Sequence, residues 1–116
     1  SELIIHVGKY IAPNIDEFSK ENDYLVFSGI GNHQTFISMI KNYNLNIKKD
    51  IEFPDHYQYS IADINKILQE ANNLNCKILT TEKDFLRLEH KDVSKINFIK
   101  SDLKILDENK LIKALL

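Results

Sequence analysis

The stretch YLVFSGIGN, residues 24–32, decides the fold class of this chain. It opens with an apolar run of the length of a buried strand, and the Gly-Ile-Gly-Asn that follows is typical of a turn. Beyond the turn, apolar residues recur at the spacing of one helix face: Phe36, Ile37, Ile40 and Tyr43. The segment therefore predicts a strand, a glycine loop and a helix in succession.

The same order of elements follows twice more along the chain. Residues 47–53 are typical of a second strand, which ends at Pro54. Ser60 predicts the start of a second helix with Asp63 in its first turn, and its apolar positions are Ile61, Ile64, Leu68, Ala71 and Leu74. Residues 77–80 predict a third strand, followed by a short helix that Thr81 caps and that carries Phe85, Leu86 and Leu88.

The two ends of the chain complete the pattern. Residues 1–22 are expected to form an arm or linker with a first strand at Leu3–Val7, and residues 96–99 a further strand before a final helix that Asp107 opens. Strands that alternate with helices favour a parallel sheet, because parallel strands need crossover connections. We therefore expect an α/β, three-layer fold: a mainly parallel open sheet with helices on both faces, Rossmann-like but without a dinucleotide or P-loop motif.

Length and composition limit the classes of function. At 116 residues the chain has the size of one domain. The formal net charge of -2 gives no case for a nucleic-acid partner. No apolar stretch approaches the ~20 residues of a transmembrane helix, so we expect a soluble chain. Cys76, the only cysteine, is expected to be a buried thiol, and the start at Ser1 rather than methionine suggests a piece of a longer protein.

Three unusual motifs each follow a predicted strand directly, at residues 29–32, 53–56 and 80–84. In a parallel sheet the carboxyl ends of the strands lie at one edge, and ligands of open α/β sheets bind outside that edge. The sequence therefore predicts that the three loops line one cleft.

The first motif is a glycine loop. Gly29 and Gly31 allow a tight turn or the close approach of a ligand, and Asn32 is expected to cap the helix that follows. A purely structural turn accounts for these residues equally well. The only Gly-Lys pair, Gly8-Lys9, lacks the Ser or Thr of a P-loop, so no such phosphate loop is predicted.

The second motif places Asp55 next to His56. An imidazole beside a carboxylate can act as an oriented hydrogen-bond donor, acid or base, while a solvated loop pair is the structural alternative. The other histidines, His6, His33 and His90, are expected to be solvated or structural.

The third motif crowds hydroxyls and charges onto a strand-to-helix junction at Thr81, Glu82, Lys83 and Asp84. A capped, solvated first turn accounts for Thr81 and Asp84. The only arginine, Arg87, lies one helical turn beyond Lys83. Cations near a helix N-terminus oppose its dipole, so Lys83 and Arg87 suggest an anionic ligand or a carboxylate partner.

The three motifs together, in this order, closely resemble tetraacyldisaccharide 4'-kinases. They read VFSGIGN at residues 26–32, FPDHY at 53–57 and TTEKDFLRL at 80–88. The similarity runs from about Tyr24 to Leu88 and corresponds to the C-terminal part of that family. One departure is His33, where the family usually has proline, and this loosens the start of the first helix.

The resemblance implies an enzyme that transfers the γ-phosphoryl group of ATP to the 4'-hydroxyl of a tetraacyldisaccharide 1-phosphate in lipid A biosynthesis. Its place would be the cytoplasmic face of the bacterial inner membrane, with Mg2+ as cofactor. In such kinases the phosphate loop and the acid-base dyad belong to an N-terminal P-loop domain of the same polypeptide, and the C-terminal domain forms one wall of the active-site cleft. The isolated chain is therefore expected to be inactive, with no catalytic residue or metal ligand of its own.

The resemblance also suggests roles for residues at the predicted cleft. His56 is expected to contact the nucleotide or a phosphate, with Asp55 orienting it, and Asp84 to hold Lys83 or Arg87 near an anionic oxygen. The full set of expected nucleotide- or substrate-binding residues is His56, Asp55, Lys83, Asp84, Arg87, Thr81, Glu82, Gly29, Gly31 and Asn32. Two alternatives are a non-catalytic α/β module that binds a phosphorylated small molecule, and a metal-dependent phosphoesterase built on Asp55, His56, Glu82 and Asp84.

Overall fold

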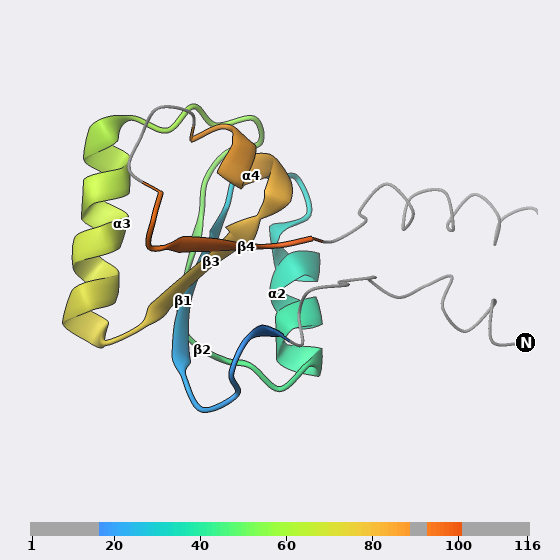
Figure 1. Cartoon of the computed structure of the whole chain (residues 1–116). Coiled ribbons are helices and arrows are strands. Elements are labelled where there is room, and N and C mark those ends of the chain that lie inside the picture. Colours follow the sequence, from blue (N-terminus) through green and yellow to red (C-terminus); the bar gives the residue numbers. More distant parts are fainter. Residues whose placement is uncertain (1–16, 89–92, 101–116) are drawn as a thin grey trace, which may run out of the picture.

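The computed structural model describes residues 17–88 and 93–100, which form a parallel sheet with helices on both faces (Figure 1). The strands are β1 (Asp23–Ser28), β2 (Asn46–Glu52), β3 (Lys77–Thr81) and β4 (Ile96–Ile99), and the helices are α2 (His33–Asn42), α3 (Ile61–Leu74) and α4 (Glu82–Leu86). The predicted α/β fold is confirmed. The strand predicted at Leu3–Val7 and the helix predicted from Asp107 lie outside the described residues.

The strand order is β2-β1-β3-β4, and every neighbouring pair is parallel. The chain leaves β1 through α2 to reach β2 on one side, then crosses back through α3 to reach β3 on the other side of β1. Connections therefore diverge at the carboxyl ends of β1 and β3. Such a divergence is where open α/β sheets bind their ligands.

The sheet separates two apolar cores, because alternate residues of β1 point to opposite faces. Tyr24 and Val26 pack with Phe36 and Ile40 of α2 in one core. Leu25 and Phe27 pack on the other face with the buried positions of α3, which are Ile64, Ile67 and Ala71. A strand that is buried on both faces reads as a continuous apolar run, which is why residues 24–27 were diagnostic.

The buried face of α3 differs in part from the sequence pattern. Ile61 is 69% exposed, although it falls at the predicted spacing, and Ile67 is buried instead. Ile61 is the first residue of the helix, next to the exposed cap Ser60, so it precedes the turns that pack on the sheet. Leu86, at the end of α4, is also 69% exposed, and Cys76 is half-buried rather than buried.

Two of the three predicted helix caps are confirmed. The Ser60 hydroxyl accepts from the Asp63 amide while the Asp63 carboxylate accepts from the Ser60 amide, a reciprocal capping box. The hydrogen bond from the Ser60 backbone is the largest cause that lowers the pKa of Asp63. Thr81 caps α4 through its hydroxyl, which accepts from the Asp84 amide at 3.0 Å. Asn32 stands at the cap position of α2, but its backbone is not extended and its side chain makes no capping bond.

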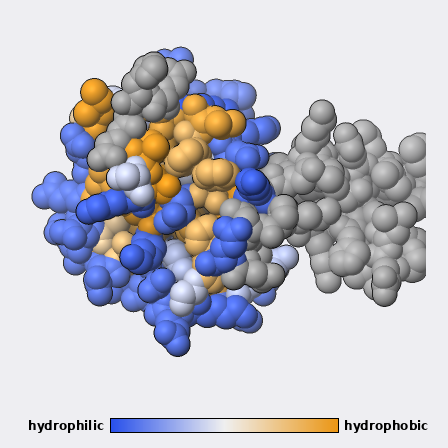
Figure 2. Space-filling model, in the orientation of Figure 1, coloured by the Kyte–Doolittle hydropathy of each residue, from blue (hydrophilic) through white to orange (hydrophobic). Residues whose placement is uncertain are grey.

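One edge of the sheet, at β4, faces the viewer in Figure 1. Figure 2 shows hydrophobic side chains gathered in the middle of this face, with hydrophilic side chains around them. Among the elements of residues 17–88 and 93–100, no helix is both long and apolar enough to span a bilayer.

Candidate functional site

Three loops meet where β1, β2 and β3 end, and we call this place the carboxyl edge. The Gly29 amide donates to Asp84 Oδ1 at 2.9 Å, which joins the first loop to the third. The His56 amide donates to the Gly29 carbonyl at 3.0 Å, which joins the second loop to the first. The predicted meeting of the three motifs at one edge is confirmed.

Gly29 is the point at which the loops come closest. A Cβ atom at this residue would lie 3.0 Å from the Pro54 carbonyl oxygen and 3.2 Å from both Asp84 Oδ1 and Tyr57 Cβ. A Cβ atom on Gly31 would meet only Asp55 Oδ2, at 3.7 Å, an ordinary contact. The missing side chain of Gly29 thus makes room for the neighbouring loops of the protein itself.

Asp84 is a fully buried carboxylate at the centre of these loops. Besides the Gly29 amide, its Oδ1 accepts from the Tyr59 hydroxyl at 2.9 Å, and its Oδ2 accepts from the Thr81 hydroxyl at 2.6 Å. Burial, followed by the charge of Asp84, raises the pKa of Tyr59 far above its ordinary value, so this phenol stays a donor. The sequence did not reveal this role of Tyr59, because 25 positions separate it from Asp84.

Arg87 extends the same network towards solvent. Its Nη1 donates to the Gly29 carbonyl at 3.0 Å and lies 3.5 Å from Asp84 Oδ1, and its Nη2 lies 3.1 Å from His56 Nδ1. The expected carboxylate partner of Arg87 is therefore present. The dipole argument that led to it was wrong, because α4 has only five residues and Arg87 is its C-cap, where a cation is favourable.

His56 is the exposed end of the network, with 80% of its side chain accessible. Its backbone φ is 60°, a left-handed conformation that is uncommon outside glycine. Its Nε2 lies 3.7 Å from Asp55 Oδ2, which is beyond hydrogen-bond distance. Arg87 rather than Asp55 therefore makes the hydrogen bond to the imidazole.

The remaining predicted residues of the third motif divide into two groups. The hydroxyls of Thr80 and Thr81 are buried and bonded within the protein, Thr80 to the Phe27 carbonyl at 2.7 Å. Lys83 is exposed and Glu82 half-buried, on the first turn of α4. Among the expected binding residues, His56, Asp55, Lys83, Gly31 and Asn32 are thus the exposed ones.

A further polar group at the carboxyl end of β1 was not predicted. His33, the first residue of α2, is buried, with Nδ1 at 2.5 Å from the Ser28 hydroxyl and Nε2 at 2.8 Å from Asp50 Oδ2. Ser28 is also fully buried, whereas the side chain of Asp50 is 43% exposed. His33 therefore ties α2 to β1 and β2, which agrees with the structural role expected for it.

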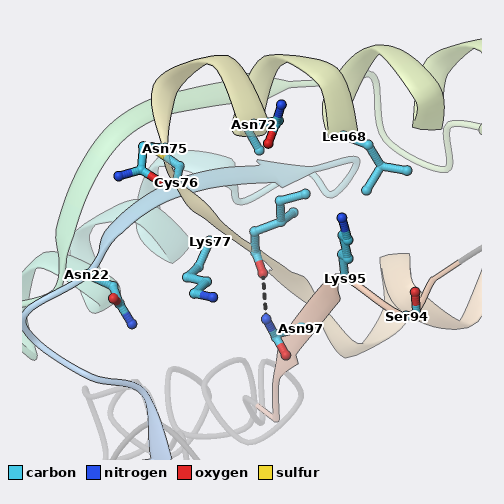
Figure 3. Close-up of a pocket in the computed structure, with 11 residues that line it drawn as sticks. Asn22, Leu68, Asn72, Asn75, Cys76, Lys77, Ser94, Lys95 and Asn97 are labelled. Carbon is cyan, nitrogen blue, oxygen red and sulfur yellow. Dashed lines mark hydrogen bonds between the residues drawn. The ribbon is translucent and has the colours of Figure 1, made fainter.

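The opposite end of the sheet, where β3 and β4 begin, is here called the amino edge. It holds a cavity of about 640 Å³ between the last turns of α3 and the starts of these strands (Figure 3). Its lining includes several exposed amides and lysines, among them Asn72, Lys77, Lys95 and Asn97. The Asn97 amide donates to the Ile78 carbonyl at 3.3 Å.

The carboxylates of the carboxyl edge do not converge as metal ligands. No group of three or more His, Cys, Asp or Glu side chains suited to a metal ion occurs in residues 17–88 and 93–100. Asp84, the one carboxylate at the centre, already accepts from an amide and two hydroxyls. The proposed phosphoesterase centre of Asp55, His56, Glu82 and Asp84 therefore does not fit this donor set.

Comparison with known proteins agrees with the motifs. A family model described as Tetraacyldisaccharide-1-P 4'-kinase matches residues 7–116. The tetraacyldisaccharide 4'-kinase of Pelagibacter ubique (strain HTCC1062) is 56% identical over 113 residues, which cover 94% of this chain and 36% of that protein. The kinase of Rickettsia typhi (strain ATCC VR-144 / Wilmington) is 37% identical over 93 residues, covering 78% of this chain and 29% of its own length.

These relatives are much longer than the chain, which spans about a third of their length. No solved structure matches it. The family match covers nearly the whole sequence, and the three motifs that suggested the resemblance lie together in the fold. This chain belongs to the tetraacyldisaccharide-1-P 4'-kinase family.

Proposed function

We propose that this chain is the C-terminal lobe of an ATP-dependent kinase that phosphorylates the 4'-position of a tetraacyldisaccharide 1-phosphate in lipid A biosynthesis. The observation that carries the proposal is the meeting of the three family motifs at the carboxyl edge, through Gly29, Asp84 and Arg87. The parent enzyme would act at the cytoplasmic face of the bacterial inner membrane. An N-terminal P-loop domain of the same polypeptide would supply the other wall of the cleft.

The chemistry of phosphoryl transfer supports such a second wall. Catalysis of this reaction rests on positioning the phosphates and neutralising their charge. The carboxyl edge offers the donors that this needs, namely the exposed His56 and Lys83 and the part-exposed guanidinium of Arg87. Asp84, Thr81 and Gly29 serve the site by holding the loops together, since their polar atoms are bonded within the protein.

ATP and Mg2+ would be bound mainly by the N-terminal domain. The carboxyl edge fits one part of this ligand, the phosphate oxygens, because its exposed nitrogen groups are donors. When bound, Mg2+ would neutralise charge on the transferring phosphoryl group. Without a P-loop, the 116 residues by themselves should neither hydrolyse ATP nor transfer phosphate.

The experiment that tests this proposal uses the full-length protein encoded by the parent gene. His56→Ala should lower kcat/KM for the tetraacyldisaccharide about ten- to a hundredfold, the loss of one charge-assisted hydrogen bond. Melting should barely change, since the side chain is 80% exposed. The control is Asn72→Ala at the amino edge, which should alter neither quantity.

Two results would contradict the proposed function. If the full-length protein lacks 4'-kinase activity altogether, while this chain alone binds a phosphorylated sugar, the non-catalytic binding module replaces the kinase. If the kinase is active and His56→Ala retains its full rate, the carboxyl edge is not a wall of the active site.

A further inference from the structure

His33 is a buried histidine with a partner on each ring nitrogen. Its Nδ1 lies 2.5 Å from Ser28 Oγ, and its Nε2 lies 2.8 Å from Asp50 Oδ2. A carboxylate only accepts, so Nε2 donates to Asp50, and in the neutral ring Nδ1 then accepts from the Ser28 hydroxyl. From the first position of α2, the ring thus connects the end of β1 with β2.

The hydrogen bond between Ser28 and His33 joins the two ends of the glycine loop, residues 29–32. Ser28 is the last residue of β1 and His33 is the first residue of α2, so this one bond spans the whole loop. A side-chain cap normally fixes such a helix start, but the Asn32 side chain makes no capping bond. The buried ring of His33 therefore fixes the start of α2 in place of a cap.

Ser28 and its neighbour Gly29 are also the residues to which the other two loops are bonded. The Ser28 carbonyl accepts from the Phe53 amide at 2.8 Å, at the start of the second loop. The Gly29 amide donates to Asp84 at 2.9 Å, and the Gly29 carbonyl accepts from Arg87 Nη1 at 3.0 Å. A shift at the end of β1 would therefore move the acceptor that holds the guanidinium of Arg87.

The packing around Gly29 leaves little tolerance for such a shift. A Cβ atom there would lie 3.0 Å from the Pro54 carbonyl oxygen and 3.2 Å from Asp84 Oδ1, so the three loops are already in close contact. Phosphoryl transfer depends mainly on the positioning of charged groups around the phosphates. A residue that fixes Ser28 can therefore affect the reaction without reaching the surface of the cleft.

We propose that His33 is a positioning residue for the carboxyl edge, because its Nδ1 holds Ser28 and thereby sets the place of Gly29 and of the Arg87 guanidinium. This proposal rests on the kinase function proposed above for the reaction that it serves. The contact with Asp50 has a separate part in it. By accepting from Nε2–H, the Asp50 carboxylate leaves Nδ1 as the acceptor that Ser28 needs.

Two substitutions separate the two ring nitrogens. Asparagine places its carboxamide where Nδ1 lies, so His33→Asn keeps the bond to Ser28 and loses the bond to Asp50. Glutamine reaches the position of Nε2, so His33→Gln keeps the bond to Asp50 and loses the bond to Ser28. In the full-length protein, His33→Gln should lower kcat/KM about tenfold and His33→Asn less than about threefold, although both should lower the melting temperature.

Amide hydrogen exchange at Gly29 reports on the loop without any substrate. This amide is bonded to buried Asp84, and NMR of the full-length protein can follow its exchange. His33→Gln and Ser28→Ala should each speed the exchange roughly tenfold, whereas His33→Asn should leave it nearly unchanged. The double variant of Ser28→Ala with His33→Gln should exchange no faster than either single variant, because both changes remove the same bond.

The control for lost stability is Asn75→Ala at the amino edge. Asn75 ends α3 in a left-handed conformation with φ of 57°, which alanine adopts less readily, so the melting temperature should fall. At a temperature where every variant is folded, kcat/KM and the exchange of Gly29 should stay as in the wild type. If kcat/KM simply follows the melting temperature across all these variants, His33 only supports the fold, and the positioning role is overturned.

The two proposals fail in different ways. If the full-length protein has no 4'-kinase activity while the exchange of Gly29 depends on Nδ1 as described, the inference about the loop stands and the proposed function fails. If His33→Gln leaves the exchange of Gly29 unchanged, or if His33→Asn speeds it as much, the inference fails whatever the activity.

Discussion

The two edges of the sheet differ in cavity volume and in how their polar groups are bonded. The amino edge contains a cavity of about 640 Å³, but its lining residues Asn72, Lys77 and Lys95 are exposed surface side chains. The carboxyl edge is organised instead around buried Asp84, whose bonds reach the loops that follow β1 and β3. The cavity and the buried polar network therefore lie at opposite edges of the sheet.

The difference indicates how the proposed cleft wall could be recognised in the fold. A wall encloses little volume by itself, so its mark is a set of polar groups held in place before any ligand arrives. The Arg87 guanidinium is held in this sense by the Gly29 carbonyl, and the His56 ring is bonded to the guanidinium. In contrast, Lys77 and Lys95, which line the amino-edge cavity (Figure 3), are exposed side chains.

The strongest test of this contrast removes the centre of the carboxyl edge. Asp84→Ala should lower the free energy of unfolding by roughly 3–5 kcal/mol, because it leaves the Gly29 amide and the Tyr59 and Thr81 hydroxyls buried without their acceptor. Urea unfolding of the 116-residue chain measures it.

The matched control for Asp84 is Asp55→Ala. Its carboxylate is 55% exposed, so its removal should change the free energy of unfolding by less than about 0.5 kcal/mol. Equal effects of the two variants would show that the buried network does not hold the carboxyl edge together.

A second test compares the two glycines of the first motif. Gly29→Ala should destabilise the chain by about 1–3 kcal/mol, because the new methyl group would press on the Pro54 carbonyl and on Asp84. Gly31→Ala meets only Asp55 at ordinary distance and should cost less than about 0.5 kcal/mol. Melting temperatures of the two variants decide the matter, and a larger loss at Gly31 would contradict the loop packing described here.

A third test compares a lysine from each edge in the full-length protein. Lys83→Ala should raise KM for the substrate or ATP about two- to fivefold, which corresponds to one exposed ionic contact of roughly 0.5–1 kcal/mol. Lys95→Ala, at the amino-edge cavity, should leave KM and kcat as they are. A larger kinetic effect at Lys95 would place the substrate cleft at the amino edge and contradict the proposed site.

Much of the fold follows from sequence because its signals are local. The apolar run at residues 24–27, the Ser60 capping box and the Thr81 cap each involve residues within a few positions of one another, and each was predicted. The meeting of the loops was also predictable, because strand direction alone places the three motifs at one edge.

The contacts within the site could not be read from the sequence. Tyr59 and Asp84 are 25 positions apart in the sequence, and His56 and Arg87 are 31 apart. No spacing pattern in the sequence therefore predicts either contact. That Asp55 orients His56 stays a prediction: the two side chains form an ion pair at 3.7 Å, while the hydrogen bond to the ring comes from Arg87. The prediction of a cap at Asn32 failed because its residue type fits but its backbone conformation does not.

The smallest expected effect concerns the thiol at the amino-edge cavity. Burial is the largest cause that raises the pKa of Cys76 above its ordinary value of 9.0, with nearby Asp23 acting the same way and Lys48 opposing them. Because the thiolate is the reactive form, less of it is present at neutral pH than in an ordinary cysteine. Alkylation of the chain by iodoacetamide should therefore be slow at neutral pH, and its rate should still be rising above pH 9.0.

Lys48→Met provides the control for this measurement. It removes the cation that lowers the pKa of Cys76, so the midpoint of the alkylation profile should move to still higher pH. Cys76 is the only cysteine, so mass spectrometry follows the reaction without ambiguity. A midpoint clearly below 9.0 would mean that the cavity activates its thiol, and the amino edge would then hold organised chemistry as the carboxyl edge does.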